Sequence, residues 1–182
     1  FAFGVSGGPV KVALIITAGL QLHPDWVLVE GDFKNAHTAC SRAIILTELV
    51  HNPALHFLIP VFKNLYGSNT ARLYHFGAGP DEEPSSVHRS TEGLRQGCAA
   101  ASIFFNILAA RVYRRLLELI DGRGILVAVA DDLKIIGPPD LMEEVARELP
   151  GIAWREGGLR EQESKRRVFV QPSARETWIK HL

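Results

Sequence analysis

The sequence is short of cysteine and carries no excess charge of either sign. Cys40 and Cys98 are its two cysteines, and they form neither a metal-binding spacing nor a disulfide framework. A reducing compartment is therefore expected, with an intracellular location, cytoplasmic or nuclear. The 20 basic and 20 acidic residues cancel, which argues against an autonomous nucleic-acid binder, because such proteins usually carry a basic excess. The balance does not exclude an enzyme whose basic surfaces lie in other segments.

Long hydrophobic runs are also missing. The first twenty residues are largely apolar, but Gly7, Gly8, Pro9 and Lys11 interrupt them, so they fail as a membrane-spanning helix. No charged segment precedes a clean apolar run, so no secretory signal and no membrane association are predicted. The chain begins with Phe1 and not with Met, and we therefore expect that something upstream is missing.

The order of helical and extended patterns predicts one α+β domain. The 182 residues, 47% of them apolar, suffice to bury a sizeable core. Helices are expected over residues 8–20, 36–50, 53–65, 98–121 and 141–149, with a loop over 77–84. Strands are expected over residues 26–29, 71–76, 87–91, 125–130, 133–136 and 168–170. An antiparallel sheet with helices packed on one face is the economical architecture.

Acidic residues stand at the ends of two strongly apolar strands. Asp32 follows the first strand, and Asp131 and Asp132 occupy the bend of a hairpin far along the chain. If these strands are neighbours, three carboxylates converge, and they repel unless one is protonated or a cation neutralises them. Hard oxygen ligands suit Mg²⁺, and two such ions about 4 Å apart clamp an in-line attack at phosphorus. Taken singly, each acidic site also fits an ordinary cap or turn.

Four short segments follow one another in an informative order. They are Asp32-Phe33-Lys34-Asn35-Ala36, then Gly93-Leu94-Arg95-Gln96-Gly97-Cys98 followed by Phe105-Asn106, then Val129-Ala130-Asp131-Asp132, and last Gly158-Leu159 followed by Lys165. They resemble the palm motifs of reverse transcriptases, the RNA-directed DNA polymerases, especially those of non-LTR retroelements (retrotransposons). The resemblance spans roughly residues 26–170. It implies a polymerase palm with partial fingers elements over residues 1–182, with the N-terminal fingers and the thumb absent.

The resemblance also implies roles for individual residues. Asp32, Asp131 and Asp132 would be the catalytic carboxylates. Asp32 and Asp131 would ligate two Mg²⁺ ions, with Mn²⁺ as a possible substitute, while the Phe33 carbonyl helps and Asp132 acts less directly. Contacts to nucleotide and template would fall to Phe33, His37, Arg95, Gln96, Gly97 and Lys165. The implied partners are an RNA template, a DNA primer, deoxynucleoside triphosphates and the missing fingers and thumb.

The motifs depart from the family pattern at their supports. His37 stands where an aromatic residue screens out ribose 2′-hydroxyls, residues 99–102 replace Pro-Leu-Ser-Pro, and Val129 replaces an aromatic residue. Discrimination between deoxyribonucleotides and ribonucleotides is therefore in doubt. These changes leave open a catalytically inactive retroelement remnant or interaction module with a palm fold. A different palm-like nucleotidyl transferase or cyclase is a third alternative, against which the Gln96-Gly97 helix entry argues.

Overall fold

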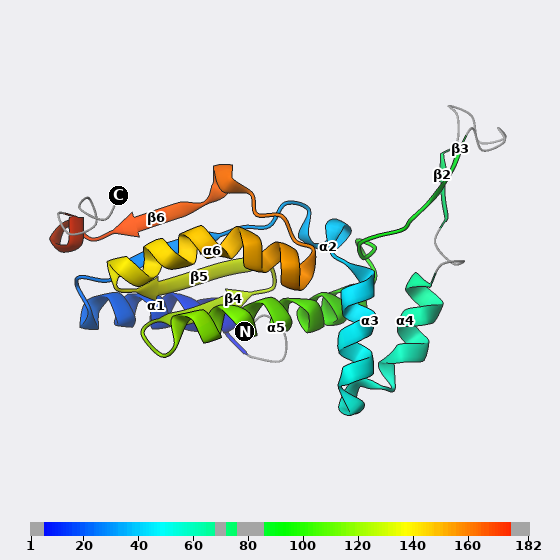
Figure 1. Ribbon diagram of the computed structural model, residues 1–182, viewed down its shortest axis with the longest axis horizontal. Coiled ribbons are helices and arrows are strands. Elements are labelled where there is room, and N and C mark those ends of the chain that lie inside the picture. The colour runs from blue at the N-terminus through cyan, green and yellow to red at the C-terminus, as the bar shows by residue number, and fades with distance from the viewer. Residues whose placement is uncertain (1–5, 68–71, 76–85, 176–182) are drawn as a thin grey trace.

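Residues 6–67, 72–75 and 86–175 are described in the computed structural model (Figure 1). The helices are α1 (Gly8–Leu22), α2 (Ala36–Ala39), α3 (Arg42–His51), α4 (Leu58–Tyr66), α5 (Ala101–Ile120) and α6 (Pro139–Gly157). Short 3₁₀ turns are η1 (Pro53–Leu55), η2 (Glu163–Lys165) and η3 (Pro172–Ala174). The strands are β1 (Val27–Gly31), β2 (Arg72–His75), β3 (Ser86–Arg89), β4 (Ile125–Val129), β5 (Asp132–Gly137) and β6 (Arg167–Val170).

Four of these strands form one antiparallel sheet in the order β4-β5-β1-β6. Strand β1 lies in the middle, paired with β5 from Val27↔Gly137 to Gly31↔Leu133 and with β6 on its other side. Strands β2 and β3 form a separate two-stranded ribbon, which stands apart from the sheet in Figure 1. The predicted α+β class and the antiparallel sheet are therefore confirmed.

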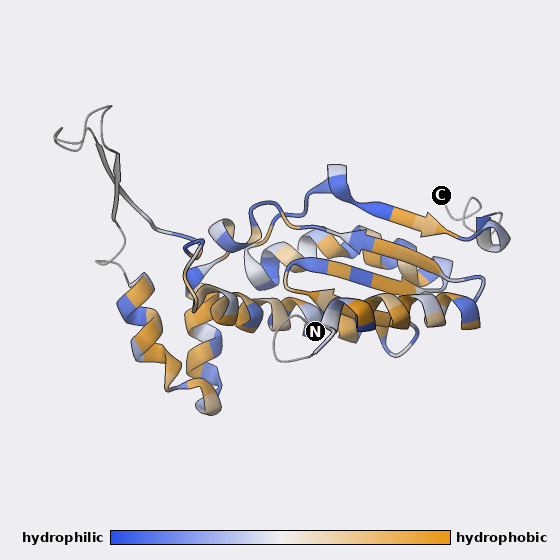
Figure 2. Ribbon diagram, turned by 180° about the vertical axis from the view of Figure 1, so that it is seen from behind, coloured by the Kyte–Doolittle hydropathy of each residue, from blue (hydrophilic) through white to orange (hydrophobic). Residues whose placement is uncertain are grey.

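One face of the sheet carries the core. Val29, Leu133 and Ile135 are buried on this face, where α5 and α6 pack together against the strands (Figure 1). A Cβ added at Gly31 would lie 3.1 Å from Leu149 of α6, so the glycine lets the helix approach the strand closely. Figure 2 shows strands that are mostly hydrophobic, joined at the β4–β5 connection by a hydrophilic turn.

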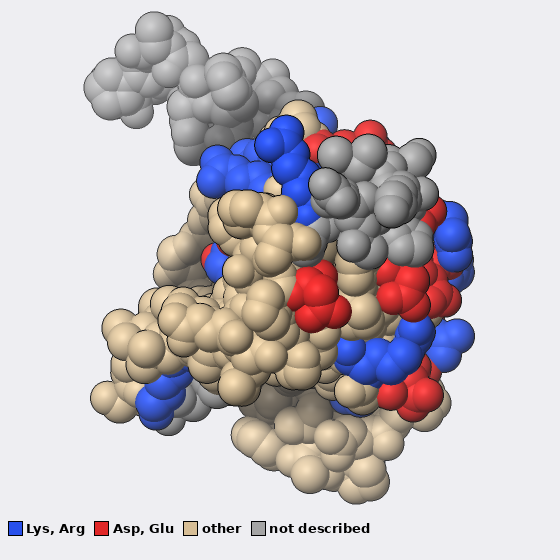
Figure 3. All heavy atoms as spheres, turned by 90° about the vertical axis from the view of Figure 1, so that its left-hand side faces the viewer, with Lys and Arg blue, Asp and Glu red and all other residues tan. Residues whose placement is uncertain are grey.

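Helix α1 contacts the opposite face. Gly19 lies against Ile136 of β5 and Ile125 of β4, two residues that are paired across the strands and point away from α6. Figure 3 views the molecule from the end where α1 lies and shows a broad uncharged area beside mixed acidic and basic groups. Within the described ranges, no helix combines the length and apolar character needed to cross a bilayer.

Several element boundaries differ from those predicted. The helix expected over residues 36–50 is interrupted at Ser41, whose extended backbone and Oγ cap the Ile44 N–H and start α3 anew. Helix α6 instead continues past Pro150, because Leu149 and Ile152 on either side are both buried against the core. The helix expected over 53–65 divides into η1 and α4, and the predicted loop over 77–84 lies outside the described residues.

Candidate functional site

The pairing of β1 with β5 brings the acidic residues to one end of the sheet. Asp32 directly follows β1, Asp131 lies in the two-residue turn between β4 and β5, and Asp132 begins β5. All three line one pocket of about 350 Å³. Its lining residues are Glu30, Gly31, Asp32, Asp131, Asp132, Lys134, Lys165 and Arg167. We call it the acidic pocket; the roles predicted for its carboxylates stay predictions.

Two lysines compensate the carboxylates of the acidic pocket. Lys165 Nζ lies 2.7 Å from Asp32 Oδ2. Lys134 Nζ lies 2.8 Å from Glu30 Oε1 and 3.1 Å from Asp132 Oδ1. Burial of the Lys134 ammonium opposes its charge, but the hydrogen bonds to Glu30 and Asp132 prevail and raise the pKa of Lys134. Among the described residues, Asp131 is the pocket carboxylate that forms no ion pair.

A tyrosine of α5 supports the turn that carries Asp131. Ala130 has φ +55°, a left-handed conformation that costs a non-glycine residue about 1 kcal/mol. Tyr113 donates its hydroxyl hydrogen bond to the Ala130 carbonyl at 2.6 Å. Burial raises the pKa of Tyr113, and the charges of Asp131 and Asp132 raise it further. Sequence reasoning missed this residue; its signal was a tyrosine in an amphipathic helix, since a buried tyrosine hydroxyl usually finds a hydrogen-bond partner.

The segment after α6 pairs with the residues that follow β1. Phe33 and Glu161 form an antiparallel bridge, in which Lys34 N donates to Arg160 O at 2.8 Å and Gln162 N donates to Asp32 O at 2.9 Å. In this kind of pair the Phe33 N–H and C=O point away from the bridging segment. They therefore face the β5 side, where the acidic pocket lies. The Phe33 side chain is buried, and Phe33 does not line the acidic pocket, so the role predicted for its carbonyl stays a prediction.

The loop before α5 is fastened to α2. Gly93 N donates to Cys40 O at 2.9 Å, and Leu94 N donates to His37 O at 2.5 Å. Gly93 has φ +68°, and a Cβ there would collide with the Thr38 carbonyl. Only glycine fits this position, for both reasons.

Arg42 holds the same loop from the side of α3. Its Nε donates to Gly93 O at 2.6 Å and its Nη2 donates to Ser90 Oγ at 2.7 Å. Burial lowers the pKa of Arg42, although a guanidinium stays charged at any ordinary pH. Sequence reasoning missed this contact, which joins positions far apart in the chain.

The residues predicted to contact nucleotide or template lie outside the acidic pocket, apart from Lys165. Arg95, Gln96 and Gly97 are exposed in the loop before α5 and do not line that pocket. Gly97 has φ +80° with open space around it, which suits both a plain turn and close approach of a ligand to the backbone. The His37 ring stacks on Phe105, with ring centroids 4.3 Å apart.

Glu30, Lys134 and Arg167 also line the acidic pocket and were not predicted. Glu30 is paired with Lys134 on one side and with Arg167 on the other, so the three share the face that carries Asp132. The signal was the two-residue period of strands, which places Glu30 with Asp32 and Lys134 with Asp132.

The acidic pocket contains the types of ligand that a divalent cation needs. Their present positions do not yet form a cation site. Carboxylate oxygens and a backbone carbonyl are the ligands that Mg²⁺ prefers. In the part of the chain that the structure describes, however, no group of three or more His, Cys, Asp or Glu side chains is poised around one metal position. Lys165 pairs with Asp32, and Lys134 pairs with Glu30 and Asp132. The donor types fit, and the lysines would have to yield their contacts.

The four-stranded antiparallel sheet, with two long helices on one face and acids at the hairpin and at the end of the neighbouring strand, matches a portion of the telomerase structure. Among solved structures, the chain is similar to telomerase, a reverse transcriptase. For apo telomerase from Candida tropicalis the TM-score is 0.72 at 11% identity, covering 94% of this chain and 33% of that one. For the same enzyme truncated from its C-terminal domain, the TM-score is 0.70 at 12% identity, covering 92% and 36%.

Telomerase from Candida albicans, in complex with the TWJ fragment of telomeric RNA, gives a TM-score of 0.66 at 13% identity, covering 94% of this chain and 31% of that one. At such identities the likeness is one of fold, and the chain spans about a third of the length of these proteins. No protein-family model and no curated protein matches the sequence.

Proposed function

We propose that this chain is the palm of an RNA-directed DNA polymerase of the non-LTR retroelement type, which extends a primer 3′-hydroxyl with deoxynucleoside triphosphates on an RNA template. One observation carries the proposal. Asp32 and the pair Asp131-Asp132, far apart in sequence, line one pocket on a fold shared with telomerase. The order of the four sequence motifs supports it independently.

In this proposal Asp32, Asp131 and the Phe33 carbonyl hold two Mg²⁺ ions, which when bound would supply charge stabilisation and activate the attacking hydroxyl. Asp132 acts less directly because Lys134 engages it. Lys165, which now pairs with Asp32, would turn toward the phosphates and offset charge that develops on the leaving pyrophosphate.

The nucleotide and template would lie over the loop before α5. Gln96 and Gly97 offer an exposed amide and an unobstructed backbone, and Arg95 adds a positive charge. His37 presents a flat ring, held by its stack on Phe105, where the family has an aromatic residue. Binding of RNA is supported by the telomeric RNA fragment in the Candida albicans structure, where it belongs to that protein.

A second candidate is a palm without activity. It is favoured by the lysine contacts, in which Lys165 pairs with Asp32 and Lys134 is shared by Glu30 and Asp132. In such a remnant the ion pairs would be permanent, and the acidic pocket would bind no cation.

Two measurements separate these functions. In a titration with Mn²⁺, the 182-residue chain is expected to bind the ion saturably, and Asp131→Asn should weaken binding about tenfold or more. Joined to fingers and thumb segments, the chain should extend a DNA primer on an RNA template only when Mg²⁺ is present, and Asp32→Asn and Asp131→Asn should abolish this. Mn²⁺ binding that is equally weak in the chain and in Asp131→Asn, together with no extension, would establish the remnant.

A further inference from the structure

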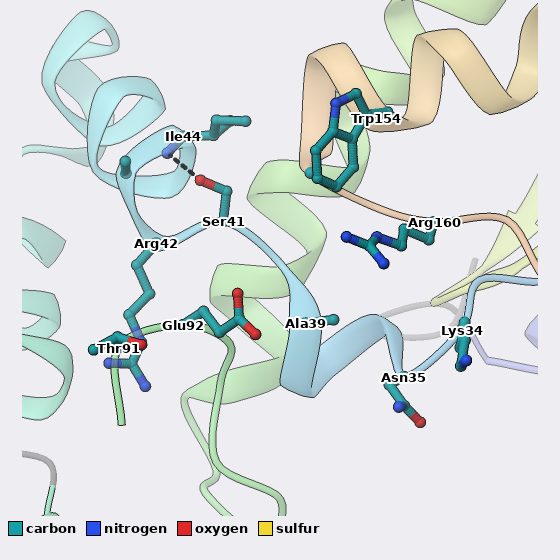
Figure 4. Close-up of a pocket in the computed structure, with 12 residues that line it drawn as sticks. Lys34, Asn35, Ala39, Ser41, Arg42, Ile44, Thr91, Glu92, Trp154 and Arg160 are labelled. Carbon is teal, nitrogen blue, oxygen red and sulfur yellow. Dashed lines mark hydrogen bonds between the residues drawn. The ribbon is translucent and has the colours of Figure 1, made fainter. Parts of the chain in front are cut away.

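A second and larger pocket lies beside the acidic one. It has a volume of about 560 Å³ and opens between the loop before α2, the start of α3, the loop at residues 91–92 and the end of α6 (Figure 4). Its lining includes Lys34, Asn35, Ser41, Glu92, Trp154 and Arg160. Asp32, Asp131 and Lys165 do not line it, so it is a separate site, and we call it the tryptophan pocket. Its size is within the range of small-ligand sites.

Two cationic residues of the tryptophan pocket come from backbone segments that are paired. The backbone bond from Lys34 N to Arg160 O, at 2.8 Å, fixes the two residues as neighbours. Both side chains are exposed, and neither forms an ion pair within the described part of the chain. Arg42, by contrast, is engaged by Ser90 and Gly93. The pocket therefore offers two positive charges that no carboxylate of the described residues pairs with, and these suit an anion such as a phosphate chain.

The start of α3 adds to this preference. Residues Ser41 to Ile44 line the pocket, and the Ile44 N–H is already bound by Ser41 Oγ. The N–H groups of Arg42 and Ala43 cannot be satisfied within the helix, and they lie at its positive end.

An aromatic platform stands at the other wall. Trp154 is 54% exposed, and the Arg160 guanidinium lies over its ring, 5.2 Å from the centroid. Figure 4 shows the guanidinium reaching into the space beneath Trp154. Nucleobases stack on both indole and guanidinium planes.

We propose that the tryptophan pocket binds a free nucleoside triphosphate, with its phosphates on Lys34, Arg160 and the start of α3 and its base on the platform of Trp154 and Arg160. The neutral charge of the whole chain disfavours a nucleic-acid strand, which would need a continuous basic track. Because Lys34 follows Asp32 by two positions, this ligand would lie next to the acidic pocket without sharing its carboxylates.

The test is isothermal titration of the 182-residue chain with ATP in buffer containing EDTA, where the acidic pocket cannot hold nucleotide through a metal. Arg160→Ala should weaken binding about tenfold or more, as expected for loss of a charge-assisted contact. Arg155→Ala is the matched control, because Arg155 is an exposed arginine in the last turn of α6, next to Trp154 in sequence, and does not line the pocket. Trp154→Ala should weaken ATP but leave inorganic triphosphate unchanged.

Each other outcome overturns the proposal. Binding that survives Arg160→Ala, or is lost in Asp131→Asn, places the nucleotide elsewhere. Equal affinity for ATP and inorganic triphosphate would show that the base does not stack on Trp154 and Arg160. An eight-nucleotide single strand that displaces ATP at lower concentration, and is itself weakened by Arg160→Ala, makes this a strand-binding groove. Since no metal or primer is used, failure here leaves the polymerase proposal untouched, and the reverse also holds.

Discussion

On one face of the sheet, Val29 and Leu133 are buried against α5 and α6. On the other face Glu30, Asp132 and Lys134, their immediate neighbours in sequence, line the acidic pocket. The same strands thus serve stability and chemistry in alternate positions, since successive side chains of a strand point to opposite faces. The comparison teaches that adjacent substitutions should separate the two roles almost completely.

The largest effect is expected on the core face. Leu133→Ala removes a side chain that is 0% exposed, and the lost burial together with the cavity should cost about 2–5 kcal/mol of unfolding free energy. Urea unfolding followed by circular dichroism measures it. Val168→Ala is the matched control on the edge strand β6, 42% exposed, and should cost less than about 1 kcal/mol. Equal losses in the two variants would mean that the sheet is not packed as described.

The free energy of unfolding should also fall at alkaline pH, because of the buried thiol of Cys40. Burial raises the pKa of the Cys40 thiol from 9.0 to about 11. The unfolded chain therefore loses this proton first, and the contribution of Cys40, fully present below pH 9, is lost as pH rises through 11. The loss should reach about 2 to 3 kcal/mol.

Unfolding of the wild type and of Cys40→Ala across pH 8 to 11 checks this expectation. Burial raises the pKa of Tyr66 to about 12. Because Tyr66 is present in both proteins, it lowers the free energy of unfolding of both at high pH. If the unfolding free energy of Cys40→Ala fell as steeply with pH as that of the wild type, the role of the thiol would be refuted.

A smaller effect on stability is expected at the β4–β5 turn. Tyr113→Phe removes the hydrogen bond to Ala130 O and should cost about 1 kcal/mol. Amide exchange of the β4–β5 turn, measured by NMR, should accelerate more than exchange in β6. Unchanged exchange at the turn would show that Tyr113 does not position Asp131.

The antiparallel sheet and its helices were predictable from the sequence because their signals are local and strong. The apolar run before Asp131 and the break at that residue specify the β4–β5 hairpin, and the apolar period after Gly97 specifies α5. Ser41 is a typical N-cap residue and could have predicted the start of α3. The prediction of one helix over residues 36–50 did not use it. Pro150 led to the opposite error, a predicted helix that ends too early. Burial of the residues next to it outweighs the single hydrogen bond that a proline removes, so the helix continues.

The supports of the site were harder to predict. The contacts of Arg42 with Gly93 and of Lys134 with Glu30 join residues far apart in the chain, so they depend on strand register and loop docking. The tryptophan pocket combines four separate segments and has no local signature. Non-LTR type, template preference and the roles of individual site residues stay predictions.

The smallest change in stability is expected on the acidic face. Lys134→Gln breaks ion pairs that remain partly exposed and should change the unfolding free energy by less than about 0.5 kcal/mol. The same variant should bind Mn²⁺ more tightly, because Glu30 and Asp132 lose an internal cation. Weaker Mn²⁺ binding would show that Lys134 orders the pocket and does not compete with the ion.

The most direct measurement is a crystal structure of the chain grown with Mn²⁺, using the anomalous signal of the metal. We predict a peak in the acidic pocket, about 2.1 Å from oxygens of both Asp32 and Asp131, with Lys165 withdrawn from Asp32. A pocket without a peak at saturating Mn²⁺, in which Lys165 and Lys134 keep their present partners, would contradict the account.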